Sequence, residues 1–265
     1  ERVLAELAPS FRRIEQISEE NTLKVLTAMR ECKVSDIHFN TSSGYAYDDI
    51  GRSKLEELYA KVFAAESALV RTQFVSGTHA LATVLFGILR PGDKLVSLTG
   101  MPYDTMQTVI GHTASSSGSL KEYGILYDEL PLNEGRVDVE RIADVLDERT
   151  KMVLIQRSRG YSRRPTLLIE DIREICNQVH RLKPDCICFV DNCYGEFVES
   201  LEPTQAGADI MAGSLIKNPG GGLAPTGGYI VGREDLVELA SYRLTAPGMG
   251  AELGADRKST RLNSS

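Results

Sequence analysis

Apolar residues recur every three to four positions in several stretches of the chain, which is the spacing of amphipathic helices. The first stretch spans residues 3–28, with interruptions expected near Pro9 and Ser18, and predicts an N-terminal helical arm over residues 1–50. Further helices are predicted over residues 55–65, 80–89, 106–111, 137–146 and 169–181.

Short apolar runs separate these helices and predict β-strands at residues 68–70, 95–98, 152–155, 186–190 and 229–231. Strands that alternate with helices are typical of α/β proteins, so we expect a mostly parallel sheet flanked by helices. In such sheets, ligands bind beyond the carboxyl ends of the strands. Gln156 and Asp191 stand at two of these predicted ends.

Composition is consistent with a folded globular protein. The chain has 265 residues, of which 42% are hydrophobic and 25% charged, which suffices for a sizeable core. A net charge of −7 disfavours nucleic acid as a partner, because phosphate backbones require clustered Lys and Arg. We find no signal peptide and no apolar stretch of about 20 residues, and therefore expect no membrane association and a cytoplasmic location.

Five cysteines indicate reduced thiols and not a metal site. Cys186, Cys188 and Cys193 cluster at one predicted strand instead of framing loops, which is typical of core thiols in a reducing compartment. Their spacing lacks the paired C-x₂-C of zinc sites, and the four histidines are scattered. We therefore expect no metal.

Lys217 is a lone lysine among the small or apolar residues Ala212, Gly213, Leu215 and Ile216. A free lysine titrates near ~10.4, and burial would lower this pKa and make the amine a nucleophile. Asp191, at the end of an earlier strand, has the chemistry to keep the pyridine nitrogen of pyridoxal phosphate protonated. The pair suggests a pyridoxal phosphate enzyme. The alternative is a surface lysine and a strand-end cap.

A small polar turn, Ser76-Gly77-Thr78, leads into the helix predicted over 80–89. Free backbone N–H groups at Gly77 and Thr78, together with the helix dipole, are suited to binding a phosphate group. Ser214, close before Lys217, adds a hydroxyl group. The alternative interpretation of the turn is a plain helix N-cap.

Four segments of the chain resemble, in order, the fold type I pyridoxal phosphate enzymes of cysteine and methionine metabolism. The closer resemblance is to the methionine gamma-lyase or aluminium resistance protein family. The segments are residues 44–52, 76–80, 189–197 and 214–222, and the resemblance extends over residues 1–255. It implies a cofactor-binding large domain at 51–255 and a C-terminal small domain that is missing from this sequence.

The resemblance also implies an activity, which is carbon–sulfur lysis of a sulfur amino acid such as cystathionine or methionine, by β- or γ-elimination. Another reaction of the same fold, such as aldol cleavage or transamination, is the first alternative, and a non-catalytic homologue is the second. Residues 256–265 turn abruptly polar and resemble an adapter-derived tail. The missing small domain normally supplies the arginine for the substrate carboxylate, so we expect a fragment with weak or no turnover.

Individual roles follow from the same resemblance. Lys217 matches the Schiff-base lysine, and Asp191 matches the partner of the pyridine nitrogen. The implied phosphate contacts are Ser76, Gly77, Thr78 and Ser214. Tyr103 matches a ring stacked on the cofactor, with a core tyrosine as the alternative.

Tyr47 and Arg52 match, more loosely, residues that reach the phosphate group in a neighbouring subunit, which implies a homodimer or homotetramer. An exposed loop and a helix-start arginine are the alternative. Relatives have an asparagine near the cofactor's phenolic oxygen, where this chain offers Gln156 or Ser158. Three nearby arginines either bind a substrate carboxylate or form a solvated face: Arg157, Arg159 and Arg163.

Overall fold

A computed structural model of the chain describes residues 2–40, 47, 49–112 and 117–254. The expected tail at 256–265 lies outside these residues, as does most of the stretch 44–48. Within the described ranges, no helix combines the length and the apolar character needed to cross a membrane.

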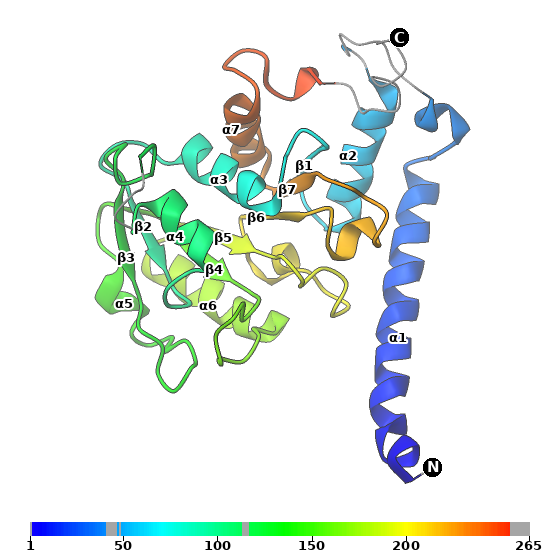
Figure 1. The fold of residues 1–265 in the computed structure, drawn as a ribbon, viewed down its shortest axis with the longest axis horizontal. Coiled ribbons are helices and arrows are strands. Elements are labelled where there is room, and N and C mark those ends of the chain that lie inside the picture. The colour runs from blue at the N-terminus through cyan, green and yellow to red at the C-terminus, as the bar shows by residue number, and fades with distance from the viewer. Residues whose placement is uncertain (1, 41–46, 48, 113–116, 255–265) are drawn as a thin grey trace.

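One sheet of seven strands, counted over the described residues, forms the centre of the molecule (Figure 1). Its order is β1-β7-β6-β5-β4-β2-β3. Strands β2 to β6 run parallel, whereas β7 is antiparallel to both β1 and β6. This confirms the mostly parallel sheet. The strands are β1 Ser67–Arg71, β2 Lys94–Ser97, β3 Leu126–Glu129, β4 Thr150–Gln156, β5 Ile187–Asp191, β6 Ile210–Ser214 and β7 Gly228–Gly232.

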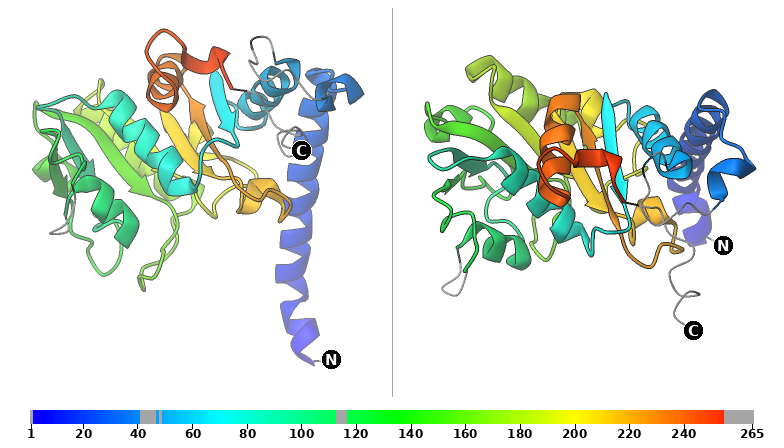
Figure 2. Two further views of the ribbon diagram at one scale, coloured as in Figure 1. Left: turned by 45° about the horizontal axis from the view of Figure 1, so that its top comes forward. Right: turned by 90° about the horizontal axis from the view of Figure 1, so that it is seen from above.

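Helices cover both faces of the sheet (Figure 2). One face packs against α2, α5, α6 and the C-terminal part of α1, and the other against α3, α4 and α7. Side chains alternate between the two layers, as they must on a pleated strand: along β5, Cys188 and Val190 face α6, whereas Ile187 and Phe189 face α3. The helices are α1 Arg2–Glu31, α2 Ile50–Val62, α3 Gly77–Ile88, α4 Asp104–Ile110, α5 Ile142–Val145, α6 Ile169–Leu182 and α7 Glu234–Leu244.

The N-terminal arm is one continuous helix, so the interruptions expected at Pro9 and Ser18 are wrong. Pro9 removes a single backbone donor, and Ser18 is only a modest helix former, which a helix of 30 residues tolerates. Asn21 fixes the arm to the body, because its Nδ2 donates to the carbonyl groups of Phe197 and Glu199, at 3.0 and 3.1 Å. The N-terminal half of α1 extends away from the body (Figure 1).

Strand β3 and helix α7 were not expected, and no residue range was predicted for β6. Strand β3 is a half-exposed edge strand that contains Asp128 and Glu129, and β6 contains small residues, so neither has the usual strand composition. The helix expected over 137–146 is also wrong, since only Ile142–Val145 is helical. Val137 and Val139 before it are β-branched, which lowers their helix propensity, and they pack on the core outside any helix or strand.

Candidate functional site

The carboxyl ends of β4, β5 and β6 meet at one edge of the sheet. Gln156 and Asp191 are the last residues of β4 and β5 and are direct partners in the ladder. Asp191 pairs on its other side with Ala212 of β6, and Lys217 follows in the turn after β6. Lys217 and Asp191, which the sequence suggested as a pair, therefore lie at the carboxyl ends of adjacent strands and line one cavity.

A cavity of about 660 Å³ opens at this edge, a volume suited to a small ligand. Helix α4 contributes Tyr103 at its N-cap, and the segment after β4 contributes the opposite wall. Asp191, Cys193, Tyr194 and Lys217 also line it. Sequence analysis singled out Tyr103, Gln156, Asp191 and Lys217, and the fold brings these four to one cavity.

Lys217 is half-buried, and its amine is held by the turn that follows β5. Its Nζ lies 4.1 Å from the centre of the Tyr194 ring, and it hydrogen-bonds the Cys193 thiol. Burial acts to lower the pKa of Lys217, but Cys193 and Asp191 outweigh it and the net direction is upward. The lowered pKa expected from the sequence is thus not found here. Ile216, one of the apolar neighbours of Lys217 in the sequence, is exposed.

Asp191 is buried on the floor of the cavity. Its Oδ1 accepts a hydrogen bond of 3.1 Å from the backbone N–H of Cys193. Burial raises the pKa of Asp191, while the Cys193 contacts and the charge of Lys217 oppose that rise. Burial likewise raises the pKa of the Cys193 thiol, which keeps it neutral at pH 7. The positive charge of Lys217 acts on the Asp191 carboxyl group and opposes the rise in its pKa.

Ser214 and Gly77 form a cradle beside the cavity. A Cβ atom on Gly77 would lie 3.0 Å from Cβ of Ser214, so a larger residue at position 77 would crowd the close approach of α3 to β6. The Ser214 hydroxyl is buried and has no hydrogen-bond partner among the described residues. In the same ranges, no hydrogen bond engages the N–H groups of Gly77 and Thr78. These free groups converge at the N-terminus of a helix, which suits a phosphate group.

Ser76 acts as the N-cap of α3, because its Oγ accepts from the N–H of His79 at 3.1 Å. The N-cap interpretation is thus confirmed for Ser76, and its role as a phosphate contact stays a prediction. Thr78 instead joins two elements, since its Oγ1 lies 3.0 Å from the Tyr103 hydroxyl. Burial raises the pKa of Tyr103 to about 12, so this phenol is neutral at pH 7.

The side chain of Gln156 holds the backbone of Tyr103 in place. Its Oε1 accepts from the N–H of Tyr103 at 3.1 Å, and its Nε2 donates to the carbonyl of Ser158 at 3.0 Å. Both polar ends of the amide are therefore engaged by protein. The expected contact of Gln156 or Ser158 with a cofactor oxygen stays a prediction.

The three arginines after β4 have different roles. Arg157 is buried, and its guanidinium donates to Asn192 Oδ1 at 2.9 Å and Glu199 Oε2 at 2.8 Å. Both interpretations of Arg157 are therefore wrong, since it is neither solvated nor directed at a substrate. Arg159 is exposed and lines the cavity, whereas Arg163 is exposed without lining it.

Tyr47 and Arg52 lie apart from the Lys217 cavity. They line a different pocket, with residues of α2 and of the segment around Ala251. Arg52 is the third residue of α2 and is buried, and its Nη1 donates to the carbonyls of Glu252 and Gly254. It is therefore a helix-start arginine, and Tyr47 is exposed. Their contact with a neighbouring subunit's phosphate stays a prediction.

The turn of residues 192–197 forms the wall around the lysine. Tyr194 and Phe197 have positive φ angles of 68° and 63°, an uncommon conformation for residues other than glycine. Such strain is typical of functional sites. The turn lies within the segment 189–197 that carries the family resemblance, but no role was predicted for its residues.

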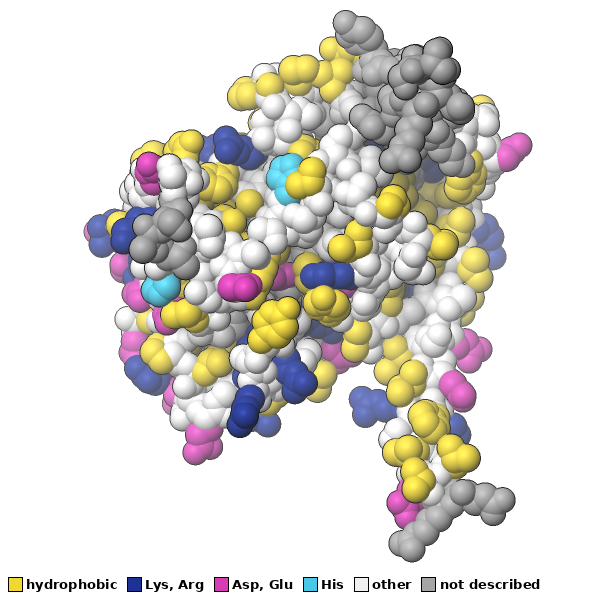
Figure 3. All heavy atoms as spheres, viewed as in Figure 1, with side chains coloured by type: hydrophobic (Ala, Val, Ile, Leu, Met, Phe, Trp, Pro, Cys, Tyr) yellow, Lys and Arg dark blue, Asp and Glu magenta, His cyan; other side chains and the backbone are white. Residues whose placement is uncertain are grey.

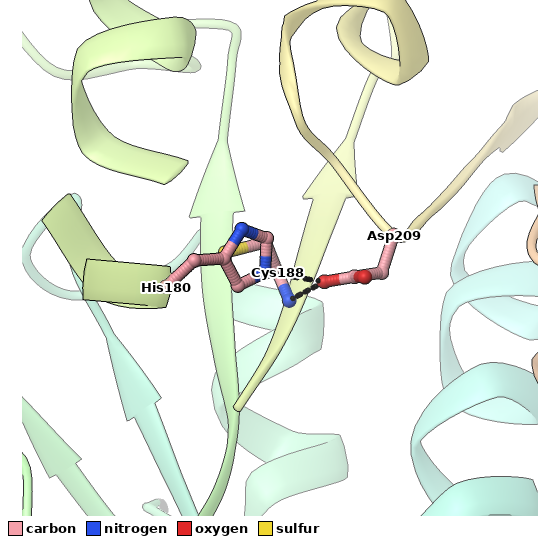
Figure 4. A group of neighbouring side chains, drawn as sticks. All are labelled: His180, Cys188 and Asp209. Carbon is pink, nitrogen blue, oxygen red and sulfur yellow. Dashed lines mark hydrogen bonds and ion pairs between the residues drawn. The ribbon is translucent and has the colours of Figure 1, made fainter. Parts of the chain in front are cut away.

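A second polar group lies near the opposite end of β5 (Figure 4). His180, Cys188 and Asp209 have potential metal-binding atoms within 4.8 Å of one another. Asp209 Oδ2 already accepts from His180 Nε2 at 2.9 Å and from the N–H of Cys188 at 2.8 Å, and Arg233 contacts Oδ1. These bonds explain the group as a structural junction of α6, β5 and the start of α7.

All five cysteines are buried free thiols, which confirms the expectation of core thiols. Only Cys193 among them lines the Lys217 cavity.

Pyridoxal phosphate fits the residues around the cavity. The cradle of Gly77, Thr78 and Ser214 offers N–H and hydroxyl donors to a phosphate group. Lys217 offers an amine, and Asp191 a buried carboxyl group. The volume and the donor set together match a phosphorylated aldehyde with a basic ring.

Comparison with known proteins places this site in context. The sequence profile of the family described as methionine gamma-lyase matches residues 1–263. The chain is 52% identical over 255 residues to the uncharacterized protein YnbB of Bacillus subtilis strain 168, a match that covers 96% of this chain and 61% of YnbB.

Two solved structures are similar over nearly all of the chain. One is a Listeria monocytogenes protein named as a candidate cystathionine beta-lyase involved in aluminium resistance, with 55% identity, a TM-score of 0.94, and coverage of 96% of this chain and 63% of that one. The other is a carbon–sulfur lyase involved in aluminium resistance from Clostridium novyi NT, with 53% identity, a TM-score of 0.92, and coverage of 95% and 60%. The chain thus spans about six tenths of the length of these relatives.

Proposed function

Because the chain belongs to the methionine gamma-lyase family, we propose that it is a pyridoxal phosphate-dependent carbon–sulfur lyase that acts on a small sulfur amino acid. Its fold is the fold type I architecture of these enzymes. The observation that carries the proposal is the position of Lys217 and Asp191 on adjacent strand ends, beside the unpartnered Ser214 hydroxyl group. The names of the Listeria and Clostridium proteins support the reaction class.

Each residue has a defined task in this proposal. The N–H groups of Gly77 and Thr78 and the Ser214 hydroxyl bind the phosphate group. Asp191 holds a proton on the ring nitrogen, and its burial strengthens that interaction. When bound, the cofactor supplies an aldehyde carbon and a ring that accepts electrons from the substrate.

Lys217 then acts as the base that removes the α-proton of the substrate. The raised pKa of its free amine means that Lys217 is protonated at pH 7 before the cofactor binds. Tyr103 forms one wall of the cavity, and Arg159, which also lines the cavity, offers a guanidinium group to a substrate carboxylate. Loss of a thiol from the β or γ carbon completes the elimination.

Absorbance tests the cofactor step. The chain mixed with pyridoxal phosphate should gain a visible band that Lys217→Ala lacks. Lys121→Ala, which changes an exposed lysine, is the matched control and should keep the band. Equal spectra for the chain and Lys217→Ala would refute the role of Lys217.

Product analysis tests the reaction. The full-length protein should release a thiol and a keto acid from cystathionine or methionine. Pyruvate would indicate β-elimination, and 2-oxobutyrate γ-elimination. Release of an aldehyde, or transfer of the amino group without thiol release, would instead assign another reaction of the same fold.

A further inference from the structure

Glu196 is a buried carboxylic acid in the turn that contacts Lys217. Its side chain is 1% exposed. Its Oε1 accepts a hydrogen bond of 2.7 Å from the hydroxyl group of Tyr229, on β7. Its Oε2 is buried and has no partner among the described residues. Nothing in the proposed reaction uses this group, although it lies next to the residues that hold the amine.

The carboxyl group of Glu196 packs closely against β6, the strand that precedes Lys217. A Cβ atom on Gly213 would lie 2.5 Å from Oε1 of Glu196 and 2.6 Å from the hydroxyl oxygen of Tyr229. Gly213 directly precedes Ser214 at the end of β6. The Glu196 carboxyl group therefore packs closely on the strand that leads to the Ser214 hydroxyl group and to Lys217.

The backbone of Glu196 is tied to the same turn. Its carbonyl accepts from Nδ2 of Asn218, the residue after Lys217, at 2.9 Å. On either side of it, Tyr194 and Phe197 have left-handed φ angles, which residues other than glycine rarely adopt. Arg157 Nη1 supports the turn by donating to the carbonyl of Gly195 at 2.7 Å. The turn thus depends on several bonds at once.

The titratable groups around Glu196 are acids. Tyr229 faces it from β7, Tyr59 from α2, Asp191 and Cys193 from the end of β5, and Glu202 from the segment after the turn. Lys217, one of the cations that line the cavity, contacts Cys193 and Tyr194. Burial, with the charges of Glu202 and Asp191, raises the pKa of Glu196 to about 7, and the Tyr229 hydroxyl opposes this rise.

We propose that Glu196 is a positioning residue for Lys217. Its protonated carboxyl group fixes the turn of residues 192–197 against β6 and β7. Loss of that proton changes the position and the electrostatic surroundings of the lysine amine. A negative charge at Glu196 is repelled by Asp191 and Glu202, and it favours the protonated form of Lys217. The amine therefore becomes less reactive as pH rises through 7. This deepens the proposed function, because it concerns the same lysine.

Labelling of the cofactor-free chain tests the proposal. Reductive methylation with formaldehyde and a borohydride reagent, followed by peptide mass spectrometry, gives the labelling rate of each lysine. The rate at Lys217 is divided by the rate at the exposed Lys121, which cancels the general effect of pH. We expect this ratio to fall about threefold or more between pH 6 and pH 8. Glu196→Gln should give a flat ratio over the same range.

Tyr229→Phe is the second variant, because it removes the hydroxyl group and keeps the ring that stacks on Phe63. Without this donor the pKa of Glu196 rises, so the fall in the ratio should move to higher pH. A flat ratio in the unmodified chain, the same fall in Glu196→Gln, or an unmoved fall in Tyr229→Phe would each overturn the proposal. No cofactor is present in this test, so failure of the lyase assignment would leave its outcome unaffected.

Discussion

Gln156 and Asp191 are partners in the sheet, each at the last position of its strand, and their side chains serve different parts of one cavity. The amide of Gln156 holds the backbone of Tyr103, whereas the carboxyl group of Asp191 lines the cavity together with Lys217. The sheet register thus fixes the distance between the Tyr103 wall and the floor of the cavity. A change in either residue should affect the site without altering the strand order.

Gln156→Met should disturb the Tyr103 wall. The variant leaves the N–H of Tyr103 and the carbonyl of Ser158 without their partner, which costs about 1–3 kcal/mol of unfolding free energy. Cofactor affinity should fall about tenfold as the wall shifts, an effect worth about 1.4 kcal/mol. Urea unfolding and a cofactor titration measure the two effects. Gln16→Met, on the exposed surface of α1, should change stability by less than about 0.5 kcal/mol.

Ser214→Ala should weaken phosphate binding without lowering stability. The Ser214 hydroxyl lacks a partner among the described residues, so its removal should leave the unfolding free energy within about 1 kcal/mol or raise it. Affinity for pyridoxal phosphate or inorganic phosphate should fall about tenfold. Ser97→Ala is the matched control, because Ser97 is buried but donates to the carbonyl of Gly100 at 2.6 Å. Ser97→Ala should lower the unfolding free energy and keep the phosphate affinity. The reverse result would contradict a phosphate-binding role for Ser214.

Glu196 should make stability depend on pH. Its pKa is raised to about 7 in the folded chain from an ordinary value of 4.5, so the folded state binds this proton more tightly than the unfolded state. The associated stability is complete below pH 4.5 and is lost as pH rises to 7, by about 3 kcal/mol. Urea unfolding at several pH values should show a smaller loss in Glu196→Gln than in the unmodified chain. If stability falls equally with pH in Glu196→Gln and in the unmodified chain, titration of Glu196 does not contribute to the loss.

Two neighbouring arginines should respond in opposite ways. Arg157→Met leaves Glu199 and the turn at Gly195 without a buried partner and should cost about 3–5 kcal/mol. Arg159→Met should change stability by less than about 0.5 kcal/mol, because Arg159 is exposed. In an active full-length protein, Arg159→Met should instead raise KM. If both variants keep full stability, the structural role of Arg157 is wrong.

The exposed apolar face of α1 should mediate self-association. Leu4, Leu7, Phe11 and Ile14 recur at helical spacing on the part of α1 that extends from the body (Figure 3). A face of this kind is commonly covered by a partner, and we predict a second copy of the chain. Sedimentation should show a dimer or tetramer that Leu7→Glu with Phe11→Glu converts to monomer. Arg13→Gln, on another face, should leave the assembly intact.

The sequence was sufficient to predict the alternating elements and the meeting of Lys217 with Asp191, because both depend on strand ends in a parallel sheet. It was not sufficient for β6, whose Ala212 and Gly213 have low strand propensity and are buried only by the tertiary fold. Helix α7 did carry a signal, with Glu234 and Asp235 in its first turn.

Two site features were beyond sequence reasoning for a physical reason. The burial of Arg157 depends on Asn192 and Glu199, which are distant in sequence. The raised pKa of Lys217 depends on Cys193 and Asp191, so neighbours in the sequence alone pointed in the wrong direction. Charge and burial are properties of the assembled site.

Because β7 runs antiparallel to β6, the loop that contains Lys217 (residues 215–227) leaves and re-enters the sheet at the same edge. Ser214 and Gly228 are ladder partners, and the N–H of Leu215 donates to the carbonyl of Gly227 at 3.0 Å, which closes the loop at its base. A loop closed in this way can open locally while the ladder stays intact. Insertions near Gly221 and Gly222 should therefore be tolerated by the fold, so this loop is a region where evolution could change the surroundings of the amine independently of the scaffold.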